Sequence, residues 1–322
     1  MKASPLLRLL ASGEWRSGEE LGQSLGISRA AVWKQVQALR DKGWNLQTAA
    51  AHGYRLEPPI EWLDEQALAQ ALAPHGLQVC VHEETASTNA DVFAAFSRGQ
   101  GHALVVLAES QTQGRGRHGR SWYSPYACNF MGSLGWRFEQ AASELAGLSL
   151  ALGVAVAGCV NAILPTRRVG LKWPNDIQID GCKLGGLLVE LAGDASGPSQ
   201  VVIGLGLNHH LSQDDRQRID QNAISLADCA VDISRQLLAE RLVLALQTAC
   251  LVFARQGFAA FQADYAALDV LRDQPVQAWR GQERIQGWGR GVSATGALCI
   301  ESMGQWLEIN SGEVTLRGDP AA

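Results

Sequence analysis

The sequence lacks the short motifs that mark the commonest metal and nucleotide sites. Its seven cysteines are widely scattered and include no C-x-x-C pair, so neither a zinc site nor a redox dithiol is indicated. There is no G-x-x-x-x-G-K-[ST] loop, and the glycines of residues 204–208 do not follow the G-x-G-x-x-G spacing. Neither a P-loop nor a Rossmann nucleotide site is therefore supported. Any nucleotide must be bound by another architecture.

The chain also lacks a large excess of charge of one sign and a secretion signal. Its 322 residues carry a formal net charge of −5, which does not indicate a nucleic-acid binder overall. The apolar run near the N-terminus is too short for a signal peptide. With an odd number of unclustered cysteines, we expect a reducing, cytoplasmic setting. A hydrophobic content of 47% is enough for a sizeable core in two or three domains.

One stretch, residues 145–164, is long enough to suggest a membrane span because it contains no charged side chain. Its glycines, alanines and Asn161 dilute its hydropathy, and its leucines and valines recur at helical spacing until Pro165 ends the run. We therefore predict a central helix buried in protein, and no membrane partner.

The first sixty residues have the pattern of a winged helix-turn-helix. Ser17 and Glu20 have the spacing of a capping box that opens a second helix, and Gly26 makes a tight turn before a third helix that begins near Ser28. Two short alternating stretches, 44–48 and 53–56, then form two strands of a wing.

The third helix is predicted to face DNA. Residues 1–62 hold eight lysines and arginines against six acidic residues, whereas the rest of the chain is net acidic. Side chains able to reach phosphates and base edges lie outside the apolar stripe of this helix. They are Ser28, Arg29, Lys34, Gln35 and Gln37. The alternative is a winged helix that serves only to pack against protein.

Residues 111–120 form the most informative segment. They follow a buried strand expected at 103–108 and hold three arginines and three glycines with no acidic residue. Such a loop can wrap amides and guanidinium groups around a phosphate or carboxylate. A flexible solvated loop or a weak nucleic-acid tail is the alternative for this segment taken alone.

Other polar residues stand where predicted helices and strands begin or end. Ser87, Thr88 and Asn89 open a helix that runs to about residue 96, where they serve either as ordinary caps or as ligand contacts. A strand at 168–173 alternates, so Lys172 projects away from its apolar face. Asp180 and Gly181 indicate a hairpin, and short alternating strands fill residues 270–316.

Taken together, these residues resemble the biotin-protein ligases, in particular those that are also biotin-operon repressors. The ordered motifs are residues 87–89, Gln111 with G-R-G-R at 114–117, K-W-P-N-D at 172–176, K-L-G-G at 183–186, and Gly204, Gly206 and Asn208. The resemblance runs from about residue 5 to about residue 317. A departure lies at residues 214–225, where Ala223 stands near a family tryptophan.

The resemblance implies an α+β multidomain protein. We expect a winged helix-turn-helix at 1–62, a central mixed α/β, class II synthetase-like ligase domain at 63–268, and an SH3-like β-barrel at 269–322.

The resemblance also implies a reaction. Biotin and ATP would give biotinyl-5′-AMP, and biotin would then pass to a lysine of a biotin carboxyl carrier protein. Lys172, Arg115 and Arg117 would be catalytic. The biotin site would comprise Ser87, Thr88, Asn89, Gln111, Arg115, Gly116, Arg117, Lys172, Gly185 and Gly186. The adenylate would contact Arg117, Trp122, Asn175 and Asn208, and Asp176 would help to hold Mg²⁺.

A further implication is regulation. The adenylate would promote a homodimer through edge-to-edge pairing of two central sheets, suited to the operator DNA of biotin-synthesis genes. Three rivals stay open: a repressor that has lost ligase activity, a lipoate ligase, and a biotin ligase whose winged helix no longer regulates transcription. The intact Lys172 and loop arginines disfavour the first, and the paired motifs disfavour the second.

Overall fold

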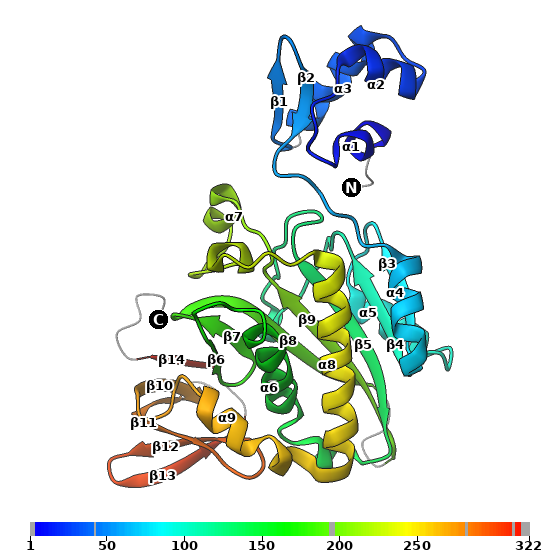
Figure 1. The fold of residues 1–322 in the computed structure, drawn as a ribbon. Coiled ribbons are helices and arrows are strands. Elements are labelled where there is room, and N and C mark those ends of the chain that lie inside the picture. Colours follow the sequence, from blue (N-terminus) through cyan, green and yellow to red (C-terminus); the bar gives the residue numbers. More distant parts are fainter. Residues whose placement is uncertain (1–3, 42, 193–196, 281–282, 311–312, 317–322) are drawn as a thin grey trace. The chain divides into compact units, whose positions relative to one another are not determined.

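The computed structural model describes residues 4–41, 43–192, 197–280, 283–310 and 313–316 (Figure 1). The chain divides into two compact units, Met1–Leu63 and Asp64–Ala322. The division into three domains at 62 and 268 stays a prediction, and residues 317–322 of the expected last domain lie outside the described residues.

The described part of the first unit is a winged helix-turn-helix. Its elements are α1 (Pro5–Leu10), α2 (Gly18–Leu25), α3 (Arg29–Asp41) and an antiparallel hairpin of β1 (Leu46–Ala49) and β2 (Gly53–Leu56). The predicted capping box is present, because Ser17 and Glu20 exchange hydrogen bonds of 3.0 and 3.1 Å. Gly26 ends α2 in the left-handed conformation, as the turn requires. The first wing strand begins at Leu46 rather than Trp44.

The second unit is built on a mixed seven-stranded sheet. Its strands are β3 (Gln78–His82), β4 (Leu104–Ala108), β5 (Phe130–Phe138), β6 (Val169–Lys172), β7 (Asp176–Ile179), β8 (Cys182–Ala192) and β9 (Ser199–Leu207). They are ordered β3-β4-β5-β9-β8-β7-β6, with β3 and β4 parallel and the other pairs antiparallel.

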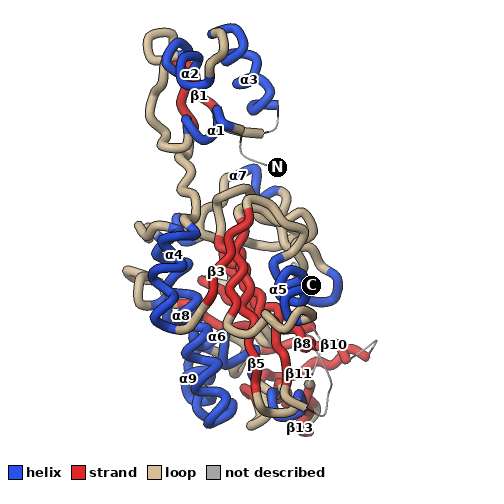
Figure 2. Tube along the Cα trace, turned by 90° about the vertical axis from the view of Figure 1, so that its right-hand side faces the viewer, coloured by secondary structure: helices blue, strands red, loops and turns tan. Residues whose placement is uncertain are grey.

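Helices cover both faces of this sheet (Figure 2). On one face lies α5 (Thr88–Phe96), which contacts β4, β5 and β9. On the other face lie α6 (Leu148–Asn161) and α8 (Arg235–Gln256). The remaining helices are α4 (Glu65–Leu72), α7 (Gln213–Gln217) and α9 (Gln262–Leu268).

The expected central helix is present but shorter than the charge-free run. It begins at Leu148, directly after Gly147, which occupies the N-cap position with a left-handed φ of 81°. Two described helical segments, Ala142–Asn161 and Arg235–Ala260, are long and apolar enough to cross a membrane by length and composition. Each is about half buried and contains a helix, α6 or α8, that packs on the sheet, so this packing accounts for the apolar side chains.

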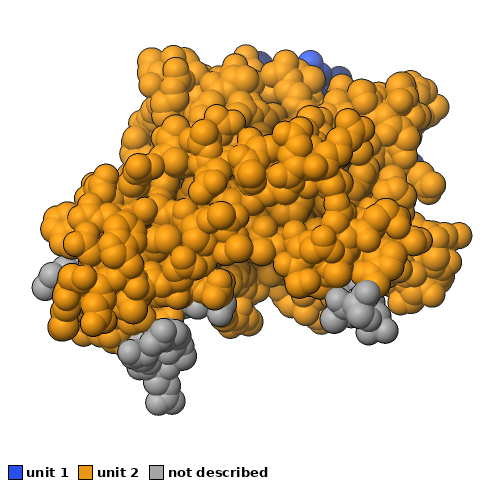
Figure 3. Space-filling view, turned by 90° about the horizontal axis from the view of Figure 1, so that it is seen from below, with its two compact units in different colours: residues 1–63 blue, residues 64–322 orange. Residues whose placement is uncertain are grey.

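The C-terminal strands form a five-stranded antiparallel sheet, as predicted. They are β10 (Pro275–Arg280), β11 (Glu283–Val292), β12 (Leu298–Ser302), β13 (Gln305–Ile309) and β14 (Glu313–Leu316), in the order β13-β12-β11-β10-β14. This sheet belongs to the same compact unit as the central sheet, and Figure 3 shows that unit as one continuous body.

Candidate functional site

The candidate site lies on the face of the central sheet that carries α5. Side chains alternate along a strand, so neighbouring residues face opposite layers. Ser133 of β5 hydrogen-bonds Thr88 of α5 at 2.7 Å. Leu171 of β6 lies against Gly153 of α6 on the opposite face, so its neighbour Lys172 projects to the α5 side. The sheet thus brings Lys172 to the face that the N-terminal end of α5 occupies.

The arginine-glycine loop is ordered by its own backbone. Trp122 N–H donates to Gly114 C=O at 2.9 Å, and Gly116 N–H donates to Arg120 C=O at 2.7 Å. A Cβ on Gly114 would lie 2.7 Å from the Trp122 carbonyl oxygen, so only glycine fits this narrow hairpin. These contacts favour a defined hairpin over a flexible solvated loop.

A cavity of about 340 Å³ lies between this loop and β8. The loop contributes Arg115, Arg117 and the intervening backbone, and the strand contributes Leu188 and Glu190. Arg115 is exposed and has no ion-pair partner among the described residues. The loop thus presents cationic side chains to an open hollow, which is the arrangement an anion requires.

Gln111 joins the loop to the start of α5. Its Oε1 accepts hydrogen bonds from the Thr88 backbone N–H at 2.8 Å and from the Thr88 hydroxyl at 3.2 Å. Ser87 occupies the N-cap position but makes no capping bond with its side chain, so of the two alternatives the ordinary side-chain cap is not supported for that residue. Instead, the side chain of Gln111, 23 residues further along the chain, accepts the hydrogen bond from the Thr88 backbone N–H at the start of α5.

Asn89 is fully engaged inside the protein. Its Oδ1 accepts from the Ser133 hydroxyl at 2.5 Å, and its Nδ2 donates to Glu190 Oε2 at 2.6 Å. It is buried, and a Cβ on Gly204 would lie 2.4 Å from Asn89 Oδ1. The geometry assigns Asn89 to anchoring α5 on the sheet, and its contact with a ligand stays a prediction.

The structure adds Lys183, which the sequence analysis placed in a motif but not in the site. Its Nζ lies 2.7 Å from Asp176 Oδ1 and 5.9 Å from the centre of the Trp122 ring. Both members of the pair are mostly buried. The K-L-G-G motif was the available signal, but only the β7–β8 hairpin shows that Lys183 reaches Asp176 and Trp122.

Trp122 packs flat on β9 rather than standing free. A Cβ on Gly206 would lie 2.4 Å from the indole ring, so the glycine makes room for it. The indole Nε1 is buried and has no hydrogen-bond partner among the described residues. This orphaned donor lies beside Lys183 and the loop.

The two asparagines predicted to contact the adenylate, Asn175 and Asn208, both donate side-chain hydrogen bonds to backbone carbonyl groups. Asn175 Nδ2 donates to Leu187 C=O at 2.5 Å, and Asn208 Nδ2 donates to Ile224 C=O at 3.1 Å. Asn208 Oδ1 is buried and has no partner within the described chain.

The paired glycines differ in their surroundings. A Cβ on Gly185 would lie 2.6 Å from the Gly206 carbonyl oxygen, so this glycine is required by the neighbouring strand. The Cβ position of Gly186 lies 3.5 Å from Asp176 Oδ1, at the Lys183–Asp176 ion pair. Gly186 therefore faces the site, and Gly185 does not need a ligand to explain it.

The segment containing Ala223 runs along the start of β8. Lys183 N–H donates to Asn222 C=O at 2.8 Å, and Ile224 N–H donates to Lys183 C=O at 3.0 Å. Arg216 fixes this segment through Ala223 C=O at 2.8 Å. Burial raises the pKa of Asp228, but hydrogen bonds from Ser225 and Arg216 outweigh it and lower that pKa overall.

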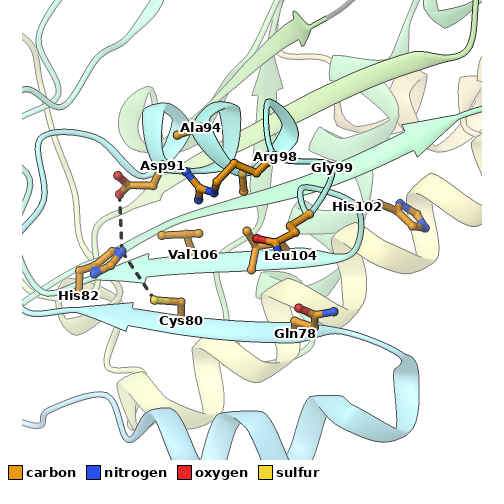
Figure 4. Close-up of a pocket in the computed structure, with 12 residues that line it drawn as sticks. Gln78, Cys80, His82, Asp91, Ala94, Arg98, Gly99, His102, Leu104 and Val106 are labelled. Carbon is orange, nitrogen blue, oxygen red and sulfur yellow. Dashed lines mark hydrogen bonds and ion pairs between the residues drawn. The ribbon is translucent and has the colours of Figure 1, made fainter.

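A second and larger hollow, of about 710 Å³, lies on the same sheet face between β3 and α5 (Figure 4). His82 Nε2 is 3.6 Å from Cys80 Sγ and 3.8 Å from Asp91 Oδ2. Both neighbours meet the same ring nitrogen, so the histidine cannot pass a proton from thiol to carboxylate. Burial, with the carboxylates of Glu65 and Asp91, raises the pKa of the Cys80 thiol, which disfavours a nucleophile.

In the first unit, the predicted DNA-contacting residues lie on the accessible side of α3. Ser28, Arg29, Lys34 and Gln35 are exposed and Gln37 is half-buried. The Ser28 hydroxyl accepts from Ala31 N–H at 3.2 Å, so it also caps the helix. Trp33, which was not among the predicted DNA-contacting residues, is 53% exposed between these polar residues.

Models of two protein families match the chain. The model of the biotin/lipoate A/B protein ligase family matches residues 82–208, and a model described as an HTH domain matches residues 3–55.

Relatives match nearly the whole length. A bifunctional ligase/repressor BirA of Salmonella typhimurium is 36% identical over 97% of this chain and 96% of its own. A biotin–[acetyl-CoA-carboxylase] ligase of Mycobacterium tuberculosis is 35% identical over 81% of this chain and 97% of its own. A solved Aquifex aeolicus biotin protein ligase in complex with biotin and ATP is 25% identical, with a TM-score of 0.62, over 74% of this chain and 98% of its own.

Proposed function

Since this chain belongs to the family of bifunctional biotin ligases and repressors, we propose that the cavity beneath the arginine-glycine loop is where biotin meets ATP. The protein is a biotin-protein ligase with biotin and ATP as substrates, and its helix-turn-helix supports a repressor role. The observation that carries the proposed site is the cavity between the loop arginines and β8, on the sheet face to which Lys172 projects.

The reaction has two steps, and neither needs a nucleophile from the protein. A biotin carboxylate oxygen forms a bond to the α-phosphorus of ATP, and the bond from that phosphorus to the bridging oxygen breaks, releasing pyrophosphate. A lysine amine of the carrier then attacks the carbonyl carbon of the mixed anhydride, AMP leaves, and the amine loses a proton. Both steps need negative charge to be neutralised and water to be excluded.

The cationic side chains around the cavity can neutralise this negative charge. Lys172 has no ion-pair partner among the described residues, so its ammonium group is available to the carboxylate and the α-phosphate. Arg115 and Arg117 border the cavity, where forked guanidinium groups can hold two oxygens each. Lys183 adds a positive group beside Trp122, partly offset by Asp176.

The biotin head would bind beside the polar side chains at the start of α5. Ser87 and Thr88 are buried there, and Gln111 uses its Oε1 for Thr88 while its Nε2 has no partner within the described chain. A cyclic urea offers both donors and an acceptor, which these groups can match. Gly116 would bring loop backbone to the ligand, and Gly186 would admit it beside Lys183.

The adenylate would lie on the Trp122 side of the cavity. Trp122 and Lys183 offer an aromatic ring beside a cation, and Asn208 Oδ1 lacks a partner. Asn175 contributes by fixing the hairpin that carries Asp176.

The described residues do not form a site for a protein-held magnesium ion. Asp176 is already paired with Lys183 at 2.7 Å, and the described residues contain no group of three or more histidine, cysteine or acidic side chains able to hold a metal. Any Mg²⁺ would therefore arrive on the triphosphate as part of the substrate.

The proposed dimer has a suitable edge. Strand β7 pairs with β8 only as far as Gly186, while β8 continues along β9 to Ala192. Leu191 on this stretch is 52% exposed. We propose that two copies pair here when the adenylate is bound, which suits a two-fold operator of biotin-synthesis genes. The carrier lysine would belong to a biotin carboxyl carrier protein in the cytoplasm.

The test is transfer of biotin to an isolated biotin carboxyl carrier domain in the presence of ATP. We expect one biotin on one lysine, with stoichiometric AMP and pyrophosphate measured by mass spectrometry and coupled assay. Transfer of lipoate but not biotin would overturn the assignment. A gel shift on DNA upstream of a biotin-synthesis gene, with and without biotin and ATP, separates the repressor from a ligase that does not regulate.

A further inference from the structure

Trp33 is a large apolar side chain left uncovered on α3. It is 53% exposed, whereas Val32, Val36 and Leu39 of the same helix are buried in the core of the first unit. Within the described chain no ring-stacking or cation-π contact involves Trp33. An uncovered indole retains much of the free energy that burial would release, so a partner that covers this surface gains it.

Trp33 is part of a small apolar surface with Ala30. The two residues are three apart on the helix and therefore neighbours, and both are exposed. Arg29 and Lys34, also exposed, border this surface with positive charge.

The helix that carries Trp33 is held firmly. Arg40 donates to the Leu46 carbonyl oxygen at 2.9 Å through Nε and to Thr48 Oγ1 at 2.7 Å. These bonds tie the last turn of α3 to the first wing strand. The apolar surface is therefore presented on a fixed element, which lowers the ordering cost of binding.

We propose that Ala30 and Trp33 read the 5-methyl groups of thymines in the major groove of the operator. This inference rests on the proposed repressor function. Thymine carries the only apolar group on the base edges of that groove. The bordering cations Arg29 and Lys34 match the phosphates that flank the groove, and they would repel the same face of a second copy. Trp33 thus sets sequence preference, while the charged residues set affinity.

The experiment uses the full-length protein with biotin and ATP. The probe is a duplex that the wild-type protein selects from a randomised pool, remade with deoxyuridine at one thymidine position at a time. Uracil lacks only the methyl group. We expect affinity measured by fluorescence anisotropy to fall about fourfold for each contacted methyl that is removed.

The informative variant is Trp33→Ala, with Trp306→Ala as control. Trp306 of β13 is 67% exposed and belongs to the other unit. We expect Trp33→Ala to bind the thymine duplex more weakly and to lose the thymine–uracil difference at one or two positions, and Trp306→Ala to keep both. Because Trp33 is exposed, the fold is retained, and biotin transfer by the same sample verifies it.

Several results would overturn the proposal. If Trp33→Ala keeps the full thymine–uracil difference, the indole does not read the methyl. If the variant binds DNA normally but loses self-association in sedimentation, the surface contacts a second copy instead. If the wild-type protein selects no sequence while it still transfers biotin, the repressor function fails and this inference fails with it.

Discussion

Two hollows lie on the same face of the central sheet, on either side of α5, and they differ in chemistry rather than in placement. The larger one, between β3 and α5, holds Cys80, His82 and Asp91, whose polar atoms meet one another. The smaller one, between the arginine-glycine loop and β8, has about half the volume and is lined by two arginines. Volume therefore does not identify the site. The two loop arginines that line the smaller hollow, on the sheet face to which Lys172 projects, mark the proposed site.

The most direct test of this comparison is to replace one cationic side chain on each side of α5. We expect Lys172→Ala to reduce adenylate formation by about 100-fold or more, since a group that neutralises charge in the transition state typically contributes that much. Arg98→Ala in the larger hollow should change it less than about twofold. Pyrophosphate release measures both. Near wild-type release by Lys172→Ala would refute the role of the lysine.

The next test measures how well the enzyme retains the adenylate rather than how fast it forms it. We expect Arg117→Gly to release the adenylate about tenfold faster, since the guanidinium clamp on its oxygens is lost. The readout is labelled biotin on unrelated proteins mixed with the enzyme. Labelling no higher than with wild type would count against the clamp. His82→Ala in the larger hollow is the matched control and should not label bystanders.

Helix α5 lies between the two hollows, and Asn89 anchors this helix on the sheet. We expect Asn89→Ala to lower the free energy of unfolding by ~2–3 kcal/mol, because Glu190 and the Ser133 hydroxyl lose buried partners. Denaturant unfolding measures the change. Asn161→Ala, which removes a bond from the end of α6 to Val169, controls for loss of a single side-chain bond. An unchanged denaturant midpoint for Asn89→Ala would show that other contacts hold α5 on the sheet.

The smallest effect is expected at Cys80. Burial and nearby carboxylates raise the pKa of its thiol, so less thiolate is present at pH 8 than for an ordinary cysteine. Iodoacetamide should modify the Cys80 thiol slowly at pH 8 and faster as the pH rises further. Peptide mass spectrometry measures the extent of modification. Cys80→Ser should change kcat less than about twofold. Rapid alkylation at pH 7 would instead reveal an activated thiol.

Local signals predicted much of the fold because they act over a few residues. Ser17 and Glu20 form the expected capping box, and Asp180 and Gly181 adopt the positive φ values of 51° and 78° that their hairpin requires. Alternation along residues 168–173 correctly placed Lys172 opposite the apolar face. Trp33 was also within reach, because the buried stripe of α3 leaves its position outside the core.

Other features depend on residues far apart in the chain and carry no local signal. The capping of α5 by Gln111, the engagement of Asn89 with Ser133 and Glu190, and the Lys183–Asp176 pair require the strands to be in register. For Asp176, the family resemblance implied a contact with Mg²⁺, and the structure pairs its carboxylate with Lys183 across the hairpin.

The sequence by itself determined which segments become helices, strands and turns, and which residues carry the charges of an anion site, because capping, alternation and glycine spacing are local properties. Only the tertiary structure decided which of those polar atoms remain available. The reason is physical: a side chain's hydrogen-bonding capacity is shared with whatever lies beside it, and its neighbours are set by the packing of α5 against the sheet.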